Sequence, residues 1–380
     1  MAIIIGTTAL VLVLSVFNGF EGLVKSLYST FYTDLKIFPA EGKVLNLSAE
    51  QLRKLKEVPG IKNYSLIAEE KALLQNGEFQ SVVYLKGVDE NYRYVAGVSD
   101  NLVRGNYDIG TEDNPKLILG AGVENAIGIL SDRNIFALKI YLPRKSGSEQ
   151  INMLEDISSD TINTSATFLI QQDFDNKYAI TNIDFVKRAL KLEDDQYSAV
   201  EISVNDVSRT DEIKKQVAGL LGKDYSVLNR FEQNRSLYTI MNVERWVIYG
   251  VLSLILVVAA FNMIGALTML VLEKEKDISV LHALGASRNF IQKIFLSEGL
   301  LLAMIGGGIG MILALIIAWA QINFGLVRIE GVSFLIDYFP VKLRLFDFLL
   351  VGATVFVIAF IASWVPSRKA SQQEFSLRSE

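Results

Sequence analysis

The sequence contains no cysteine, a single histidine and six prolines among 380 residues. Without cysteine, disulfide bonds and thiolate metal sites are excluded. His282 alone cannot form a zinc site or supply a credible Ser-His-Asp triad. The phosphate-binding pattern G-x-x-x-x-G-K-[ST] is also absent. We therefore predict no catalytic residues, no metal site and no cofactor bound by the chain itself.

The balance of basic and acidic residues excludes a further class of protein. The chain has 37 lysines and arginines against 42 aspartates and glutamates, for a net charge of −5. A nucleic-acid-binding protein would present a basic face, and none is evident, so we expect no nucleic-acid partner. The composition, 51% hydrophobic and 21% charged, fits a hybrid of membrane helices and a soluble domain.

Long apolar runs are the strongest positive feature. Each is close to or above the roughly 20 residues that span a bilayer. We predict transmembrane helices at residues 1–20, 246–272, 299–327 and 348–367. The first begins directly after Met1 without a basic flank or a cleavage site, so we interpret it as a retained helix whose cytoplasmic lead-in is missing.

The roughly 225 residues between the first two runs are enough for a folded domain. The predicted fold is α+β: four transmembrane helices with a large α+β extracytoplasmic domain, residues 21–245, inserted between the first and second. Four crossings place the segment 273–298 and the tail 368–380 on the cytoplasmic side. The same count places the loop 328–347 on the side of the large domain.

Both helices that flank the domain are expected to continue into water as stalks. One apolar face contains Phe20, Leu23, Val24, Leu27, Tyr28 and Phe31, and its counterpart contains Leu237, Ile240 and Met241. The alternative is that these are ordinary core helices of the domain.

Two β-α-β patterns, at 35–67 and 199–228, are expected to pair into one lobe formed by 35–97 and 197–230. The first contains a capping box at Ser48. Residues 98–196 would form an inserted lobe, with strands at 116–119, 136–142, 167–171 and 178–181. A polar stretch from Pro143 to Ser165 is interpreted as an exposed loop.

The segment 273–298 is predicted to form two helices separated by Gly285. Its apolar side contains Ile278, Leu281 and Leu284. Such an element is either an interfacial helix or an insert for a groove on a partner. In the third span, Gly306 and Gly310 form a G-x-x-x-G pair that favours close helix packing.

Several segments resemble the FtsX-like permeases of ABC transporters, in the order in which that family has them. The connection between the second and third spans, EKEKDISVLHALGASRNFIQKIF, is similar to their cytoplasmic coupling segment. Other segments resemble the lipoprotein-releasing permeases of Gram-negative bacteria, namely VLVLSVFNGFEGLV, LILGAGVENAIGI, IYLPRKS, VVAAFNMIGALTMLVLEKEKDI, YFPVKLRLFDFLLV and ASWVPSRKAS. The matches cover essentially the whole chain, except for the basic segment that precedes the first span in that family.

The resemblance implies an inner-membrane permease subunit that extracts lipoproteins and passes them to a periplasmic carrier. Its implied partners are an ABC ATPase dimer, which binds ATP and Mg²⁺, a second permease copy or paralogue, and membrane lipid. The implied ATPase-coupling residues are Glu275, Asp277, Ile278, Leu281, Leu284, Gly285 and Arg288.

The resemblance further places contacts to the lipoprotein acyl chains at Phe17, Phe20, Val24, Ile240, Phe334 and Phe339. The alternative is that these aromatics form an interfacial belt. The polar stretch after Pro143 matches the position of a carrier-binding loop, or is a surface loop without a partner. Three other functions remain open: an efflux permease of the MacB type, a non-transporting mechanotransducer that regulates cell-wall hydrolases, and a membrane-anchored adhesin or sensor.

Overall fold

The computed structural model describes residues 1–133, 137–143, 157–328 and 338–372. It divides into two compact units, which we describe separately. One is helical and contains residues 1–24 and 237–380, and the other is the α+β domain of residues 25–236. Two helices, α1 (Ala2–Phe31) and α8 (Arg235–Glu273), run from one unit into the other.

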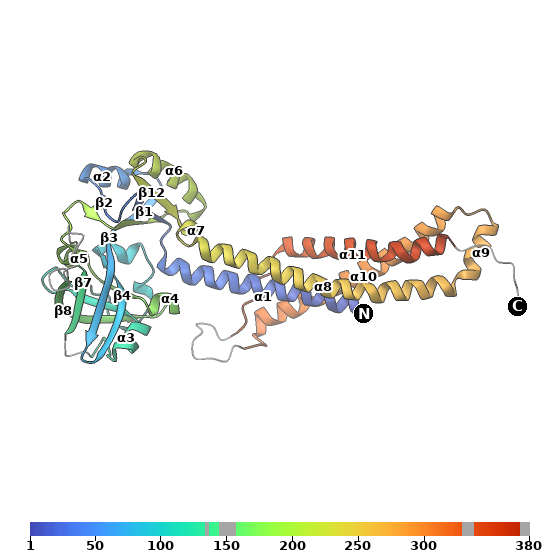
Figure 1. Cartoon of the computed structure of the whole chain (residues 1–380), viewed down its shortest axis with the longest axis horizontal. Coiled ribbons are helices and arrows are strands. Elements are labelled where there is room, and N and C mark those ends of the chain that lie inside the picture. The colour runs from blue at the N-terminus through green and yellow to red at the C-terminus, as the bar shows by residue number, and fades with distance from the viewer. Residues whose placement is uncertain (134–136, 144–156, 329–337, 373–380) are drawn as a thin grey trace. The chain divides into compact units, whose positions relative to one another are not determined.

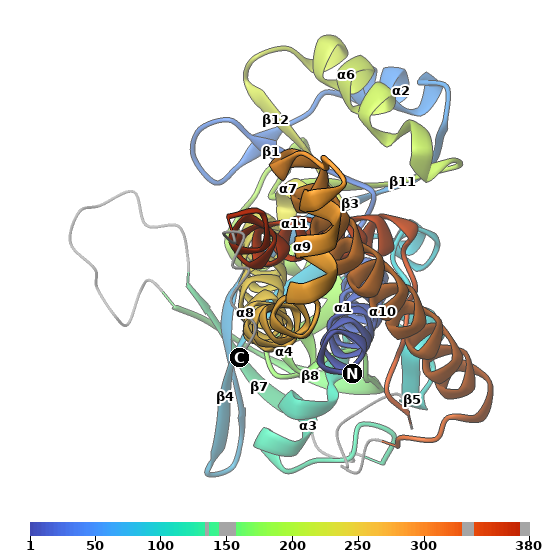
Figure 2. The ribbon, with the colours of Figure 1, turned by 90° about the vertical axis from the view of Figure 1, so that its right-hand side faces the viewer.

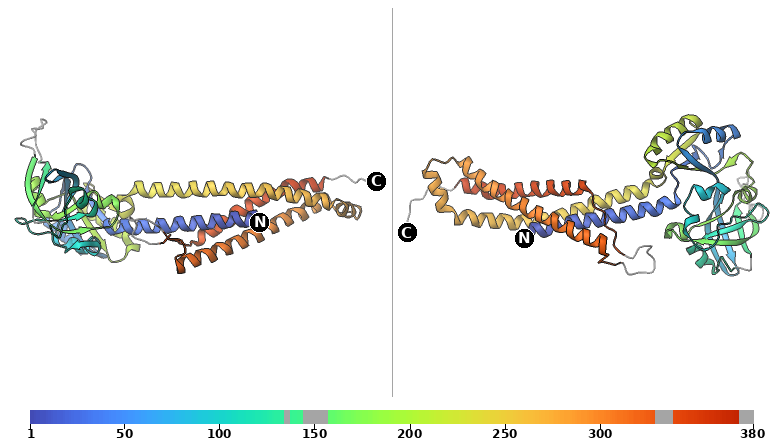
Figure 3. Two further views of the ribbon diagram at one scale, coloured as in Figure 1. Left: turned by 90° about the horizontal axis from the view of Figure 1, so that it is seen from below. Right: turned by 180° about the vertical axis from the view of Figure 1, so that it is seen from behind.

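The helical unit contains the long apolar helices that the sequence predicts. In the described part of the chain, four helices are long and apolar enough to cross a membrane. They are α1, α8, α10 (Arg288–Phe324) and α11 (Leu345–Ser371); in Figure 2, α1, α8 and α11 are seen nearly end-on and α10 runs obliquely. The short helix α9 (Glu275–Ala283) links α8 to α10 at one end of this unit (Figure 3).

Small residues bring the membrane helices together, as the G-x-x-x-G pair predicts. A Cβ added at Gly310 would lie 2.7 Å from the Ile4 carbonyl oxygen, and one at Gly306 would touch Ile3. Thr8 Oγ1 donates to the carbonyl oxygen of Gly310 at 3.0 Å. A buried apolar cluster then joins all four helices through Leu10, Val11, Leu14, Leu256, Ala314, Val351 and Val355.

The α+β domain is built around one large sheet whose strands are ordered β12-β1-β11-β3-β4-β9-β6-β8-β5. These strands and β7 are β1 (Leu35–Pro39), β3 (Ile61–Asn76), β4 (Phe79–Val88), β5 (Leu102–Gly105), β6 (Lys116–Gly120), β7 (Leu138–Pro143), β8 (Ile157–Phe168), β9 (Tyr178–Asn182), β11 (Ala199–Val204) and β12 (Tyr225–Asn229). A separate two-stranded sheet pairs β2 (Leu45–Asn46) with β10 (Gln196–Tyr197). The order shows that the two β-α-β patterns interleave, with β1 between β11 and β12.

Part of the large sheet closes into a barrel, because β7 pairs with both β3 and β8. The ring is β3, β4, β9, β6, β8 and β7. Each strand of the ring therefore has a hydrogen-bonded neighbour on both sides over part of its length. Leu74, Leu85, Ile140 and Ile162 are at most 1% exposed and belong to one buried cluster. The long strand β3 belongs both to the barrel and to the β12-β1-β11 sheet. Strand pairing is therefore continuous between the two expected lobes, residues 35–97 with 197–230 and residues 98–196.

Helices cover this sheet, and most of them begin at a side-chain cap. They are α2 (Ala49–Glu57), α3 (Ala121–Ile127), α4 (Gln172–Asp175), α5 (Ile183–Leu190), α6 (Thr210–Leu221) and α7 (Arg230–Gln233). Ser48 forms the predicted capping box with Gln51. Helices α2 and α6 lie side by side, as expected for the two β-α-β units (Figure 1).

One prediction for the domain was wrong. The polar stretch from Pro143 to Ser165 is not a continuous loop, because β8 begins at Ile157 and ends at Phe168, where the sequence predicts a strand over 167–171. The inward positions Ile162, Ala166 and Phe168 alternate with polar residues and are at most 1% exposed. Residues 144–156 lie outside the described residues.

The two helices that flank the domain join it differently. Helix α1 continues unbroken to Phe31, whose ring stacks on Phe174 with a centroid distance of 4.3 Å and lies 4.6 Å from Tyr178. Helix α8 is separated from α7 by Asn234, which has non-helical angles of φ −128° and ψ 37°. The domain therefore holds the end of α1 in an aromatic socket, while a backbone break precedes α8.

Candidate functional site

The end of α1 nearest the domain brings two of the predicted acyl-chain contacts together. Phe20 and Phe339 pack edge to face with ring centroids 5.7 Å apart. Phe17 and Val24 on the same helix are half-buried. Ile240 is 53% exposed, so its side chain is available to lipid or to a ligand. Phe334 lies outside the described residues.

The segment before α11 docks closely on α1 at this level. The Lys342 N–H donates to the Ser15 carbonyl oxygen at 2.9 Å, and Glu21 forms an ion pair with Arg344 at 3.2 Å. A Cβ at Gly19 would lie 2.8 Å from the Val341 nitrogen and closer still to the carbonyl of Pro340. Only glycine leaves room for this approach.

A buried carboxylate joins three helices at the same level, which the sequence analysis missed. Asp347 is 1% exposed and accepts a 2.6 Å hydrogen bond from Asn18 Nδ2. It also forms an ion pair with Arg245 of α8. In the sequence, the one sign of this site was that an acidic residue directly precedes the fourth apolar run.

The coupling segment has the predicted helix-glycine-helix form. Gly285 has a φ of +91°, which favours glycine, and the Ser287 side chain caps α10. Leu281 is half-buried and Leu284 is 79% exposed. Glu275, Asp277 and Arg288 are also exposed.

Ile278 differs from the other predicted anchors of this segment. It is 1% exposed and packs with Val271, Ile291, Phe295 and Ala370. It therefore holds α9 against the helical unit and does not face outward. Sequence reasoning missed two exposed apolar neighbours, Val280 at 58% and Phe290 at 54%.

Buried charges lie inside the α+β domain. Glu201 is 2% exposed, and its carboxylate contacts Lys86 Nζ at 2.8 Å and Lys36 Nζ at 3.0 Å. Lys86 also donates to Tyr92 Oη at 3.0 Å and lies 4.9 Å from the centre of the Phe31 ring. Desolvation raises the pKa of Glu201, but the two ammonium groups outweigh it and hold the pKa below its ordinary value.

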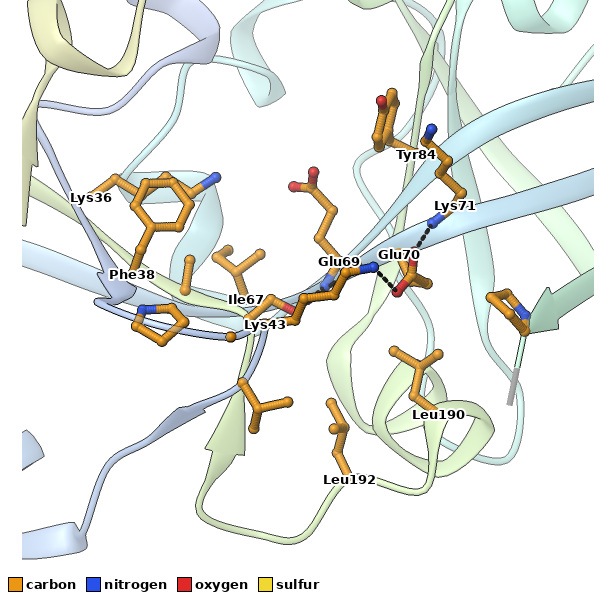
Figure 4. A pocket seen from close by; sticks show the side chains of 16 residues that line it. Lys36, Phe38, Lys43, Ile67, Glu69, Glu70, Lys71, Tyr84, Leu190 and Leu192 are labelled. Carbon is orange, nitrogen blue, oxygen red and sulfur yellow. Dashed lines mark hydrogen bonds and ion pairs between the residues drawn. The ribbon is translucent and has the colours of Figure 1, made fainter. Parts of the chain in front are cut away.

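A pocket of about 720 Å³ opens beside this network (Figure 4). Strand β11 lies between β1 and β3 and begins at Ala199. The pocket lies beyond that end of β11, where the edges of β1 and β3 face each other. The N–H groups of Glu69 and Lys71 donate to Ser198 Oγ at 2.8 Å and to Glu70 Oε1 at 3.0 Å.

Two prolines that line the pocket, Pro39 and Pro143, have no N–H to donate. Because these backbone donors are capped or missing, this part of the sheet is protected against the addition of another strand. In the described residues, no cluster of three or more potential metal ligands occurs.

Comparison with known proteins matches both units to families. Residues 249–375 match the FtsX-like permease C-terminal family, and residues 1–134 match the MacB-like periplasmic core domain. The chain therefore carries an FtsX-like permease region that follows a MacB-like periplasmic core region. The matches place its four long helices in the bacterial inner membrane and its large domain in the periplasm.

Relatives of this permease cover nearly its whole length. A lipoprotein-releasing system transmembrane protein LolE from Haemophilus influenzae is 24% identical over 98% of this chain and 91% of its own. A lipoprotein-releasing system transmembrane protein LolC from Neisseria meningitidis serogroup B is 24% identical over 98% and 90%. The crystal structure of the periplasmic region of MacB from Actinobacillus actinomycetemcomitans covers 57% of the permease and 98% of its own chain, with 13% identity and a TM-score of 0.39.

Proposed function

We propose that this chain is the permease subunit of an ABC transporter that extracts lipoproteins from the outer leaflet and passes them to a periplasmic carrier. The similarity to LolE and LolC over 98% of the chain carries this proposal. In it, a separate ATPase dimer binds ATP and Mg²⁺, and the permease pairs with a second copy or a paralogue. The permease transmits the movement and performs no covalent chemistry.

The rings at the outer end of α1 support the choice of cargo. Acyl chains need an apolar surface that is open to the bilayer, because each CH₂ exposed to water costs about 0.8 kcal/mol. Phe17, Phe20, Val24, Ile240 and Phe339 offer such a surface at the membrane boundary.

A photo-crosslinking residue in place of Phe20 is expected to capture lipoprotein in membranes. The matched control is Phe356 of α11, which is 46% exposed and also aromatic. We expect little cargo at that control position. Equal labelling at both positions would instead indicate an interfacial aromatic belt. If the cargo is a small amphiphile, as for an efflux permease, neither position will capture lipoprotein.

The exposed face of the coupling segment supports an ATPase partner. We expect Leu284→Asp or Leu281→Asp to weaken co-purification of the ATPase by roughly 10- to 100-fold, because one buried leucine contributes on the order of 1.5–3 kcal/mol. Leu326→Asp is the control, since Leu326 is 66% exposed just beyond the other end of α10. Co-purification that is equal in all three variants contradicts the docking.

A carrier is required because a lipid anchor cannot cross water unaided. We propose that the segment after Pro143 receives it, because its sequence is polar and its position matches that of a carrier-binding loop in the resembling family. Because β8 begins at Ile157, the exchange for a Gly/Ser linker should be confined to residues 146–156. We expect cargo binding and ATP hydrolysis to persist while transfer to the carrier stops. Normal transfer would show that the segment is only a connection.

A further inference from the structure

Asp347 is a charged group in an unusual place, at the start of a membrane helix and almost fully buried. A buried carboxylate is costly unless it is hydrogen-bonded and paired. Both of its side-chain partners come from other helices, Asn18 from α1 and Arg245 from α8. The charge of Asp347 therefore stabilises the structure only while α1, α8 and α11 lie together at their outer ends.

The contacts on the two sides of Asp347 differ in kind. Toward α1, the segment before α11 is held by the 2.9 Å backbone bond from Lys342 to Ser15 and by the close approach at Gly19. Toward α8, Asp347 is held by the Arg245 side chain, and one turn further along, the Tyr249 hydroxyl bonds the Thr354 hydroxyl. Side-chain contacts of this kind can break without disturbing either helix backbone.

The two members of the ion pair also differ in exposure. The Arg245 side chain is 23% exposed, whereas that of Asp347 is 2% exposed. A long arginine side chain at the edge of an apolar span, as Arg245 is beside the run that begins at Trp246, can turn to the membrane surface and keep its charge solvated. Asp347 would then still accept a hydrogen bond from Asn18. Separation of α8 thus leaves both charged groups with a polar neighbour.

We propose that Asp347 and Arg245 form a releasable clamp. The closed clamp holds the outer end of α8 against α1 and α11, and its release lets α8 move away so that the apolar surface beside Phe20 opens to the bilayer. Arg245 and Asp347 are positioning residues, because they set the spacing of helices and do not touch the cargo. The link to cargo entry and the response to ATP rest on the proposed function.

The clamp can be tested without knowledge of the cargo. Because the chain has no cysteine, Tyr249→Cys with Thr354→Cys creates a single thiol pair that reports the spacing of α8 and α11. Phe20→Cys with Phe339→Cys is the matched control pair, since it reports a contact that does not involve α8. Each pair is crosslinked with a short bis-maleimide in the membrane-embedded complex with its ATPase, with and without ATP and vanadate.

We expect the 249–354 yield to change between the two nucleotide conditions. Arg245→Met should lower the yield roughly tenfold in the condition that favours crosslinking, and should abolish the difference. The control pair should respond to neither. Exchange of the charges, Arg245→Asp with Asp347→Arg, should restore the yield, because Asn18 can accept a hydrogen bond through its Oδ1, which has no partner in the structure.

Three results would overturn the proposal. The first is a 249–354 yield that is the same in both nucleotide conditions, since a purely structural ion pair would not respond to ATP. The second is an Arg245→Met variant that crosslinks like the parent. The third is a charge exchange that gives a folded, membrane-inserted protein without restoring the yield. If the clamp behaves as expected but photo-crosslinking at Phe20 captures no lipoprotein, the cargo assignment fails and the clamp stands.

Discussion

Glu201→Ala is expected to destabilise the periplasmic domain by about 3–5 kcal/mol, because it leaves the Lys86 ammonium buried without its counter-charge. That loss is a large part of the roughly 5–15 kcal/mol that stabilises a typical domain. The effect is measured by thermal unfolding of the full chain in detergent. Amide hydrogen exchange in β3, β4 and β11 provides a second, local measurement.

The control for this variant is Glu212→Ala. Glu212 also pairs with a basic residue, Arg209 at 2.9 Å, but both side chains are about half exposed. Such exposed pairs contribute little to stability, because water and salt screen the two charges. A double replacement, Lys86→Met with Glu201→Leu, removes both buried charges and should restore much of the lost stability. Equal effects of Glu201→Ala and Glu212→Ala would show that the buried pair is unimportant.

The same pair makes the domain sensitive to acid. Because the pKa of Glu201 is lower in the folded than in the unfolded state, the unfolded chain binds the proton more readily. The stabilisation is therefore complete above the ordinary pKa of 4.5 and is lost as the pH falls below it through the folded value. In Glu201→Gln, this part of the acid dependence should disappear.

Gly19→Ala is expected to abolish transport with little change in membrane insertion. The added methyl group would overlap the Pro340 carbonyl and push the segment before α11 away from α1. Overpacking of this kind typically costs about 1–3 kcal/mol, and here the cost falls on the contact that positions Phe339 and Asp347. Transport by the reconstituted complex and crosslinking of the Phe20→Cys with Phe339→Cys pair measure the two consequences.

Gly22→Ala is a close control, one turn further along the same helix. A Cβ at Gly22 would be 3.8 Å from the Lys342 side chain, an ordinary van der Waals distance. The two variants have the same effect on helix propensity, so only the approach to Pro340 distinguishes them. If Gly22→Ala impairs transport as much as Gly19→Ala, the effect does not arise from docking of the segment.

The sequence alone was sufficient for features that depend on local patterns. The apolar runs identified α1, α8, α10 and α11 because a bilayer-spanning helix needs about 20 consecutive, predominantly apolar residues. The capping box at Ser48 and the chain reversal at Gly285 could also be predicted from the sequence, because a few neighbouring residues determine each of them.

Features that depend on pairing between distant segments were harder to predict. β8 was interpreted as part of a loop because its first half is polar, and its strand structure depends on pairing with β7, β6 and β5. The barrel arises from a strand that pairs twice, which periodicity does not reveal.

The candidate site follows the same rule. The exposure of Leu284 agrees with the coupling pattern, but Ile278 has the same helical spacing and is buried by contacts from α10 and α11. The sequence analysis missed Asp347, because nothing local showed that Asn18 and Arg245 would surround it.

The unequal attachment of α1 and α8 to the periplasmic domain has a mechanical consequence. A helix whose end is fixed transmits bending and torque, whereas a helix that ends at a flexible joint transmits only force along its axis. The ring contacts of Phe31 fix the end of α1, and the backbone break at Asn234 forms such a joint before α8. The last turn of α1 therefore cannot rotate without moving the rings of Phe174 and Tyr178, whereas the first turn of α8 can change its direction relative to α7 by rotation about the backbone of Asn234.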